Sequence, residues 1–148
     1  MIRVQAAPFD PAAELAAFAG RVGGAGGVAS FLGLVRGDSD GGEIATLELE
    51  HYPPLTERSV AAIGAEAHGR FGLIGYVIVH RTGTLAPGEA IVFVAAAAAH
   101  RRAAFEAVDY MMDRLKTEAP FWKREHGPNG SRWIEARAVD HDDRARWA

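Results

Sequence analysis

Residues 90–120 read AIVFVAAAAAHRRAAFEAVDYMMDRLKTEAP, and this stretch decides the fold. Its first part, residues 90–98, is an uncharged apolar run, which is typical of a buried strand. From His100 to Glu118 the apolar residues recur at spacings of three and four, which predicts a long helix. Pro120 ends that helix, because proline cannot continue the hydrogen-bond ladder. A buried strand followed at once by a long helix is therefore the centre of the predicted fold.

The segments on either side of this stretch predict further strands and helices. Residues 73–80 form a second apolar strand, and the turn LAPGE at 85–89 joins it to 90–98 as an antiparallel hairpin. Asp10-Pro11 is typical of a helix start, and Thr56 is a candidate N-cap for a helix running to about Arg70. Other strands are predicted at 2–4, at 28–35 (as a buried strand), at 44–52 and at 131–139.

These elements predict an α+β domain over residues 1–148, with a mainly antiparallel sheet and helices packed on one side. We find no repeat and no linker that would indicate a second domain. Residues 140–148 are rich in charge and are predicted to form a mobile tail.

Composition excludes several classes of protein. The absence of cysteine excludes a disulfide framework, a thiolate zinc site, an iron–sulfur cluster and a catalytic thiol. The net charge of −3 argues against a nucleic-acid binder. The N-terminus has no signal-peptide pattern, and the apolar run 91–99 is too short to span a membrane. We therefore expect a soluble, cytoplasmic protein without nucleic-acid or membrane partners.

The common motifs for metals and nucleotides are also absent. The chain has six histidines, but none forms an HExxH or HxxxH pair. The glycine-rich stretch 23–27 has neither dinucleotide-binding nor P-loop spacing. The sequence thus predicts no metal site and no cofactor.

Cations placed beside apolar surface are the more informative feature. On a helical wheel Arg101 begins a stripe formed by Phe105, Val108, Met112 and Leu115, and Lys116 lies at its edge. Such a lysine either extends to water, which is the ordinary explanation near a helix C-terminus, or meets an anion.

The residues after Pro120 favour the second explanation, that Lys116 meets an anionic ligand. Phe121 to Glu125 combine two aromatic residues with two cations and could wall a pocket for a flat or anionic ligand, and Arg36 at a strand end could reach it. Arg101 and Lys116, however, are separated by about 22 Å along a straight helix. Either the helix bends or starts late, or His100 and Arg101 serve a neighbouring subunit. We favour the second option, a homodimer with composite sites.

Taken together, the motifs resemble those of the MoaE family, the large catalytic subunit of molybdopterin synthase. They occur in the family's order: FLGLVR (31–36), LEHYPPLTE (49–57), HRTGTLAPGE (80–89), HRRAAFE (100–106), and DRLK (113–116) with PFWKRE (120–125). The resemblance covers most of the chain from residue 28 to 139. It implies an α/β hammerhead-like fold in a single domain with a small β subdomain.

The resemblance also implies an activity and a set of site residues. The family converts cyclic pyranopterin monophosphate to molybdopterin, with sulfur from the C-terminal Gly-Gly thiocarboxylate of a small ubiquitin-like subunit. A chain without cysteine fits this chemistry, because a partner must supply the sulfur. A homodimer core of a heterotetramer is expected. By position, the family's catalytic lysines correspond to Lys116 and Lys123, and its substrate-binding residues to Arg36, His100, Arg101, Arg124, Glu125 and Arg137.

Two other classes of function compete with this one. A non-catalytic module could bind a ubiquitin-like protein or an anionic ligand with a similar pocket, although the presence of both lysines favours catalysis. An RNA-binding protein could use Phe121 and Trp122 as a stacking platform. The near balance of acidic and basic residues between 100 and 126 argues against RNA.

Overall fold

The main sheet sits at the centre of the computed structural model, which describes residues 1–40 and 42–148. Its strand order is β1-β6-β8-β2. The strands are β1 (Ile2–Gln5), β6 (Gly75–Arg81), β8 (Ala90–Ala98) and β2 (Gly27–Leu34). β1 runs parallel to β6, whereas β6 and β2 both pair with β8 antiparallel. The α+β class, the mainly antiparallel sheet and the pairing of the two apolar strands are confirmed.

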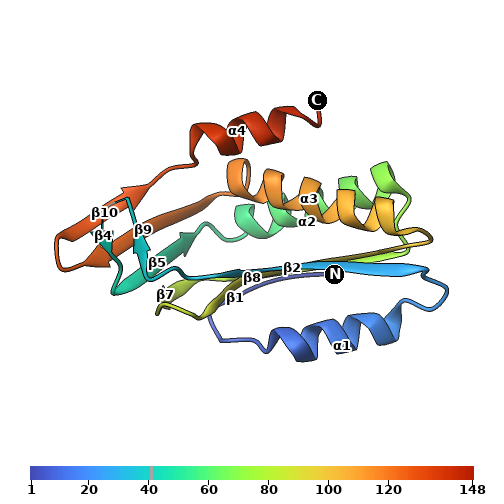
Figure 1. The fold of residues 1–148 in the computed structure, drawn as a ribbon, viewed down its shortest axis with the longest axis horizontal. Helices are drawn as coiled ribbons and strands as arrows, with labels where there is room; N and C mark the ends of the chain where they lie inside the picture. The colour runs from blue at the N-terminus through green and yellow to red at the C-terminus, as the bar shows by residue number, and fades with distance from the viewer. Residues whose placement is uncertain (41) are drawn as a thin grey trace.

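Helices cover both faces of this sheet (Figure 1). α2 (Leu55–Phe71) and α3 (Arg101–Thr117) lie on one face, and α1 (Pro11–Arg21) lies on the other. The prediction that all helices pack on one side is therefore wrong for α1. β6 and β8 are apolar on both faces, so both faces need cover. Ile78 and Val94 belong to the core under α2 and α3, whereas Val77, Val79 and Phe93 pack with Phe18 of α1.

The two predicted helix starts have different outcomes. Asp10 caps α1 as predicted, accepting hydrogen bonds from the N–H groups of Ala12 at 2.9 Å and Ala13 at 3.3 Å. Thr56 is not the N-cap of α2, because Pro54 takes that position. The buried Thr56 hydroxyl instead accepts from the Tyr52 N–H at 2.8 Å and donates to the Pro120 carbonyl at 3.0 Å. It thereby ties the start of α2 to the end of the α3 segment.

β2 is an edge strand, and the prediction that it is buried is wrong. It pairs with β8 on one side, and the other side carries no strand in the described part of the chain. The exposed fractions of Val28, Phe31, Leu32 and Leu34 are 38%, 42%, 38% and 50%. An apolar edge of this kind is a surface that another chain could cover.

A second, smaller sheet matches the expected β subdomain. Its order is β10-β9-β5-β7, with β5 at Thr46–His51, β7 at Gly83–Leu85, β9 at Phe121–Gly127 and β10 at Gly130–Ile134. The strand predicted at 44–52 is confirmed by β5, whose Leu47 and Leu49 are buried with Leu85. The pair β3 (Asp38–Ser39) and β4 (Gly42–Glu43) lies beside this sheet.

The end of the chain differs from the prediction. The last strand stops at Ile134, and Ala138–Ala145 form helix α4 where a strand end and a mobile tail were expected. Trp147 fixes this helix, because its ring contacts Phe71 and Tyr110 and its Nε1–H donates to Asp113 at 2.7 Å. Among the described residues, no helix is long and apolar enough to cross a membrane.

Candidate active site

A cavity of about 580 Å³ lies where the main sheet, α3 and the second sheet meet. Its wall combines apolar residues of β2 and α3 with polar and charged side chains from several elements. The polar and charged residues that line it are Arg36, His80, Lys116, Lys123, Glu125, Glu135, Arg137 and Asp140. Five of the predicted site residues are thus brought together: Arg36, Lys116, Lys123, Glu125 and Arg137.

The chain has two lysines, Lys116 and Lys123, and both line this cavity. Lys116 lies in the last turn of α3, and Lys123 lies on β9 after the break at Pro120. Strand alternation turns Phe121, Lys123 and Glu125 to the cavity side of β9. Within residues 1–40 and 42–148, neither ammonium forms a hydrogen bond or an ion pair, so both can meet an anionic ligand.

The surroundings of Lys123 favour its neutral form. Burial is the main cause that lowers the pKa of Lys123, and the positive charge of Lys116 lowers it further. The carboxylate of Asp140 acts in the opposite direction. A lysine with a lowered pKa can exchange a proton nearer to neutral pH than an exposed lysine can.

Asp140 is a cavity residue that the sequence analysis missed. It accepts a hydrogen bond from the Arg137 backbone N–H at 2.9 Å, and its carboxylate also contacts the Arg137 guanidinium. Burial alone would raise the pKa of Asp140, but the hydrogen bonds from Arg137 and the charge of Lys116 outweigh it and lower the pKa. The three-residue spacing of Arg137 and Asp140 at the start of α4 was the available signal.

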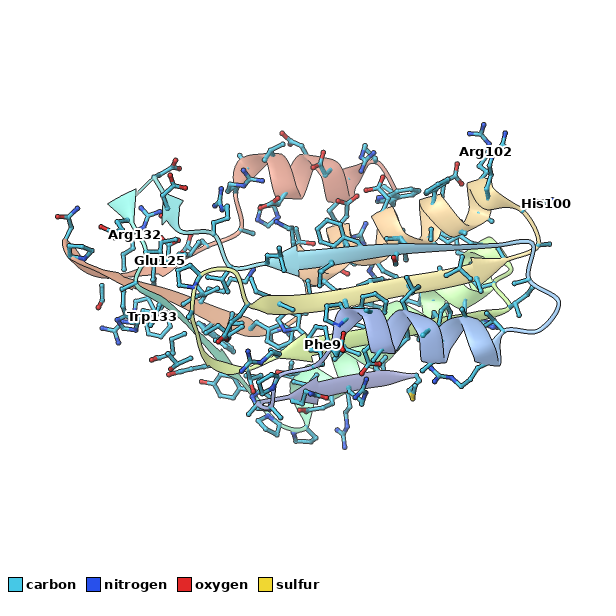
Figure 2. All side chains as sticks on the ribbon, turned by 60° about the horizontal axis from the view of Figure 1, so that its bottom comes forward. Phe9, His100, Arg102, Glu125, Arg132 and Trp133 are labelled. Atoms are coloured by element: carbon cyan, nitrogen blue, oxygen red, sulfur yellow. The ribbon has the colours of Figure 1, made fainter. Side chains whose placement is uncertain are left out.

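Glu125 is a fixed anion in the cavity wall. Its side chain is buried and accepts hydrogen bonds from the Ser39 hydroxyl at 2.6 Å and from Arg132 Nε at 3.1 Å. Figure 2 shows Glu125 and Arg132 together at the β9–β10 end of the molecule. Glu125 and Lys123 therefore line the same cavity.

Arg124 does not line the cavity, in contrast to the prediction that the whole stretch 121–125 walls it. The segment is a strand, so alternate residues point to opposite faces. The Arg124 guanidinium lies 5.2 Å from the ring centre of Trp133, the residue of β10 that is paired with Arg124. Trp122 is also on the outer face, where its ring meets Tyr52 edge-on at 4.5 Å.

His100 and Arg101 lie at the other end of α3. They line a separate hollow of about 610 Å³ with Gly26, Ala99, Arg102, Phe105 and Glu106. Figure 2 shows His100 and Arg102 at the end of the molecule opposite Glu125. α3 already begins at Arg101, so a late start does not bring these residues to the lysines. The predicted separation of Arg101 from Lys116 is confirmed.

The predicted apolar stripe of α3 is only partly buried. Val108 and Leu115 are buried, but the Phe105 side chain is 64% exposed. The buried face runs instead through Ala104, Ala107 and Met111. Small alanines let α3 approach the alanine-rich β8 closely, which turns Phe105 outward.

His80 is a second cavity residue that the sequence analysis missed. It is the penultimate residue of β6, and its buried ring lies parallel to Phe121, with 3.8 Å between ring centres. No pattern in an apolar strand distinguishes a histidine in a cavity wall from one in an ordinary core. In the part of the chain that the structure describes, no group of three or more His, Asp or Glu side chains could hold a metal ion.

Comparisons with known proteins agree with this fold. A relative from Caulobacter vibrioides, named molybdopterin synthase catalytic subunit, is 54% identical over 140 residues, covering 95% of this chain and 92% of the relative. A relative of the same name from Pseudomonas aeruginosa is 50% identical over 146 residues, covering 99% and 97%.

Solved structures give the same result. A MoaE protein from Burkholderia ambifaria superposes with a TM-score of 0.84 at 47% identity, covering 99% of this chain and 97% of that one. Molybdopterin synthase from Staphylococcus aureus superposes with a TM-score of 0.80 at 32% identity, covering 88% and 94%. The family model described as MoaE protein matches residues 4–118. On this evidence, the chain belongs to the MoaE family.

Proposed function

We propose that this chain is the catalytic subunit of a molybdopterin synthase. It converts cyclic pyranopterin monophosphate to molybdopterin by installing two sulfurs as a dithiolene. Its relatives from Caulobacter vibrioides and Pseudomonas aeruginosa carry this name. The observation that carries the proposal is that both lysines of the chain, Lys116 and Lys123, line one cavity.

The cavity offers the groups that this reaction needs. Opening a cyclic phosphate develops negative charge, and fixed cations directed at that charge lower the barrier. Lys116 in α3, Arg36 after β2 and Arg137 at the N-cap of α4 can supply this stabilisation. Lys123, whose pKa burial and Lys116 lower, is suited to exchange a proton. Which lysine acts as acid and which as base stays open.

The sulfur must come from outside the chain, which has no cysteine to carry it. We propose that a small ubiquitin-like subunit delivers it as a C-terminal Gly-Gly thiocarboxylate. The relatives are named catalytic subunit, which implies a further subunit in those proteins. The apolar wall formed by Phe31, Leu34 and Ile91 can accept an extended tail with little charge.

We further propose a homodimer as the core of a heterotetramer, with His100 and Arg101 acting at the partner's cavity. Two observations support it. Those residues lie in a hollow of their own, away from the lysines. The exposed apolar edge of β2 gives a second copy a surface to bury. Mixing Lys116→Ala chains with Arg101→Ala chains should restore activity in part, and the absence of rescue would count against shared sites.

The roles of Arg36, Glu125 and Arg137 in substrate binding are likewise proposals, supported by their place in the cavity wall. The single-domain organisation over residues 1–148 and the cytoplasmic location stay predictions. Arg124 has less support than the others, because its side chain lies on the opposite face of β9.

One experiment separates this function from its alternatives. The chain is incubated with the cyclic pyranopterin and the thiocarboxylated small subunit, and the dithiolene product is assayed. Product formation is expected. Tight binding of the small subunit without any product would instead support a non-catalytic binding module. If the chain retained RNA at low salt and released it at high salt, the result would support the RNA-binding alternative.

A further inference from the structure

The buried ring of His80 has a fixed orientation and a fixed tautomer. Its Nδ1 lies 2.8 Å from the backbone carbonyl oxygen of Arg81. A carbonyl oxygen can only accept, so Nδ1 carries the proton and Nε2 carries the lone pair. The side chain is 6% exposed and lines the lysine cavity. A hydrogen bond on one edge of the ring and a buried setting together hold it in place.

The flat face of His80 meets the first residue of β9. The His80 and Phe121 rings are stacked, with centres 3.8 Å apart and planes 14° apart. Phe121 lies two residues before Lys123 on the same face of that strand. The Phe121 backbone N–H also donates to the Ala119 carbonyl at 2.8 Å, which fixes the turn out of α3. The stack therefore joins the main sheet to the second sheet beside Lys123.

The relative placement of the two lysines depends on this joint. Lys116 belongs to α3, which packs on the main sheet, whereas Lys123 belongs to the second sheet. Thr56 donates its hydroxyl hydrogen to the Pro120 carbonyl, and His80 stacks on the neighbouring Phe121. The start of β9 is thus clamped between these two contacts.

The charge of the ring matters as well as its shape. Burial is the main cause that lowers the pKa of His80 to about 3, and the charge of Lys123 adds to it, while the hydrogen bond to Arg81 acts in the opposite direction. The ring is therefore neutral at physiological pH. The other charged groups around the cavity are Lys116 from α3, Glu125 and Lys123 from β9, Arg36, Glu135, Arg137 and Asp140. On β6 itself, Arg81 is paired with Glu89 at 2.8 Å.

We propose that His80 is a positioning residue for Lys123: its clamped, uncharged ring fixes the start of β9 and closes the cavity wall beside the amine. A neutral ring does this without placing a third cation next to two lysines. An aliphatic side chain would lack the flat face for Phe121 and the donor for Arg81. The kinetic part of the test below rests on the proposed function, but the spectroscopic part does not.

The spectroscopic test uses the fact that the chain has two lysines. Full-length protein with 13C at lysine Cε gives one resonance for each, and Lys116→Arg assigns them. The pH titration of the Lys123 resonance is compared between wild type and His80→Ala. Water should enter beside the amine in the variant, so the pKa of Lys123 should rise toward that of an exposed lysine. His80→Gln, which keeps a neutral polar group but no ring, should do the same.

Two matched variants separate positioning from general destabilisation. Val79→Ala removes a fully buried side chain of the same strand on the opposite face, so it should lower the melting temperature without moving the Lys123 titration. His80→Phe keeps a flat, neutral ring and should retain the lowered pKa of Lys123. The proposal is overturned if the Lys123 titration is unchanged in both His80→Ala and His80→Gln, or if Val79→Ala shifts it as much.

Turnover gives the second readout. His80→Ala should lower kcat by about tenfold to a hundredfold, the size expected for a misplaced catalytic group, with little change in KM. His80→Phe should recover most of that loss. If wild type makes no product while the titrations behave as described, the proposed function fails and the positioning role stands. If wild type is active and His80→Ala matches it, the positioning role fails alone.

Discussion

Asp140→Asn tests how the start of α4 is held against the cavity. The carboxylate accepts the Arg137 N–H at 2.9 Å, contacts the Arg137 guanidinium and lies in the first turn of the helix. Asparagine keeps an acceptor but loses the charge. A carboxylate in the first helical turn contributes about 0.3–1 kcal/mol, and a charged acceptor adds to that. We expect a loss of about 1 kcal/mol at pH 7.

The pH dependence of this loss follows from the direction of the pKa shift. The pKa of Asp140 lies below its ordinary value of 3.8, because hydrogen bonds from Arg137 and the charge of Lys116 outweigh the effect of burial. The carboxylate therefore stabilises the fold fully above the unfolded-state pKa. This stabilisation disappears as pH falls through the folded-state value. Wild type and Asp140→Asn should thus differ at pH 7 and converge in acid.

Urea unfolding at pH 7 and at about pH 3 measures both quantities. Asp143→Asn is the matched control, because Asp143 is a half-buried residue of the same helix whose carboxylate lies 4.0 Å from Arg146 Nε. It should change the free energy of unfolding by only a few tenths of a kcal/mol. An equal loss for Asp140→Asn at both pH values, or no loss at pH 7, would refute the reasoning. In activity, loss of the Asp140 charge should move the limb of the pH profile that reports Lys123 to lower pH, since Asp140 raises the pKa of Lys123.

Two further substitutions test the end of the chain and the outer face of β9. Trp147→Ala removes ring contacts with Phe71 and Tyr110 and the hydrogen bond to Asp113, so chemical denaturation should show a loss of about 2–4 kcal/mol; a loss below about 0.5 kcal/mol would mean that α4 is not docked. Arg124→Ala should leave kcat/KM within about threefold, because its side chain lies over Trp133 outside the cavity. A loss as large as that of Lys123→Ala would place Arg124 at the substrate.

The sequence predicts most of the fold because two signals are unambiguous. The uncharged run 90–98 and the three-to-four spacing after His100 each fit one element, and the structure has β8 and α3 there. The run 28–35 is equally apolar, yet β2 is an exposed edge. An apolar run does not say whether a strand has one neighbour or two, or whether another chain covers it. The charged residues after 138 predicted a mobile tail, because the sequence does not show that Trp147 packs on Phe71 and Tyr110 and so holds α4 in place.

The site is predictable where chemistry and spacing agree. Lys116 and Lys123 flank a proline-ended helix, and the structure brings them to one cavity. Arg124 was misplaced because no strand was predicted where β9 runs, and a strand sends neighbouring residues to opposite faces. Asp140 and His80 were missed for a different reason. They come from α4 and β6, and only the folded chain brings these elements to the lysines.

The central claim is that the two lysines act together on a phosphorylated substrate, and Lys116→Ala tests it most directly. The measurement is single-turnover formation of the dithiolene product, with the thiocarboxylated small subunit and the cyclic pyranopterin in excess. We predict a fall of at least about a hundredfold, the size of a lost acid–base group, with binding of the small subunit retained. Turnover within about threefold of wild type would contradict the account.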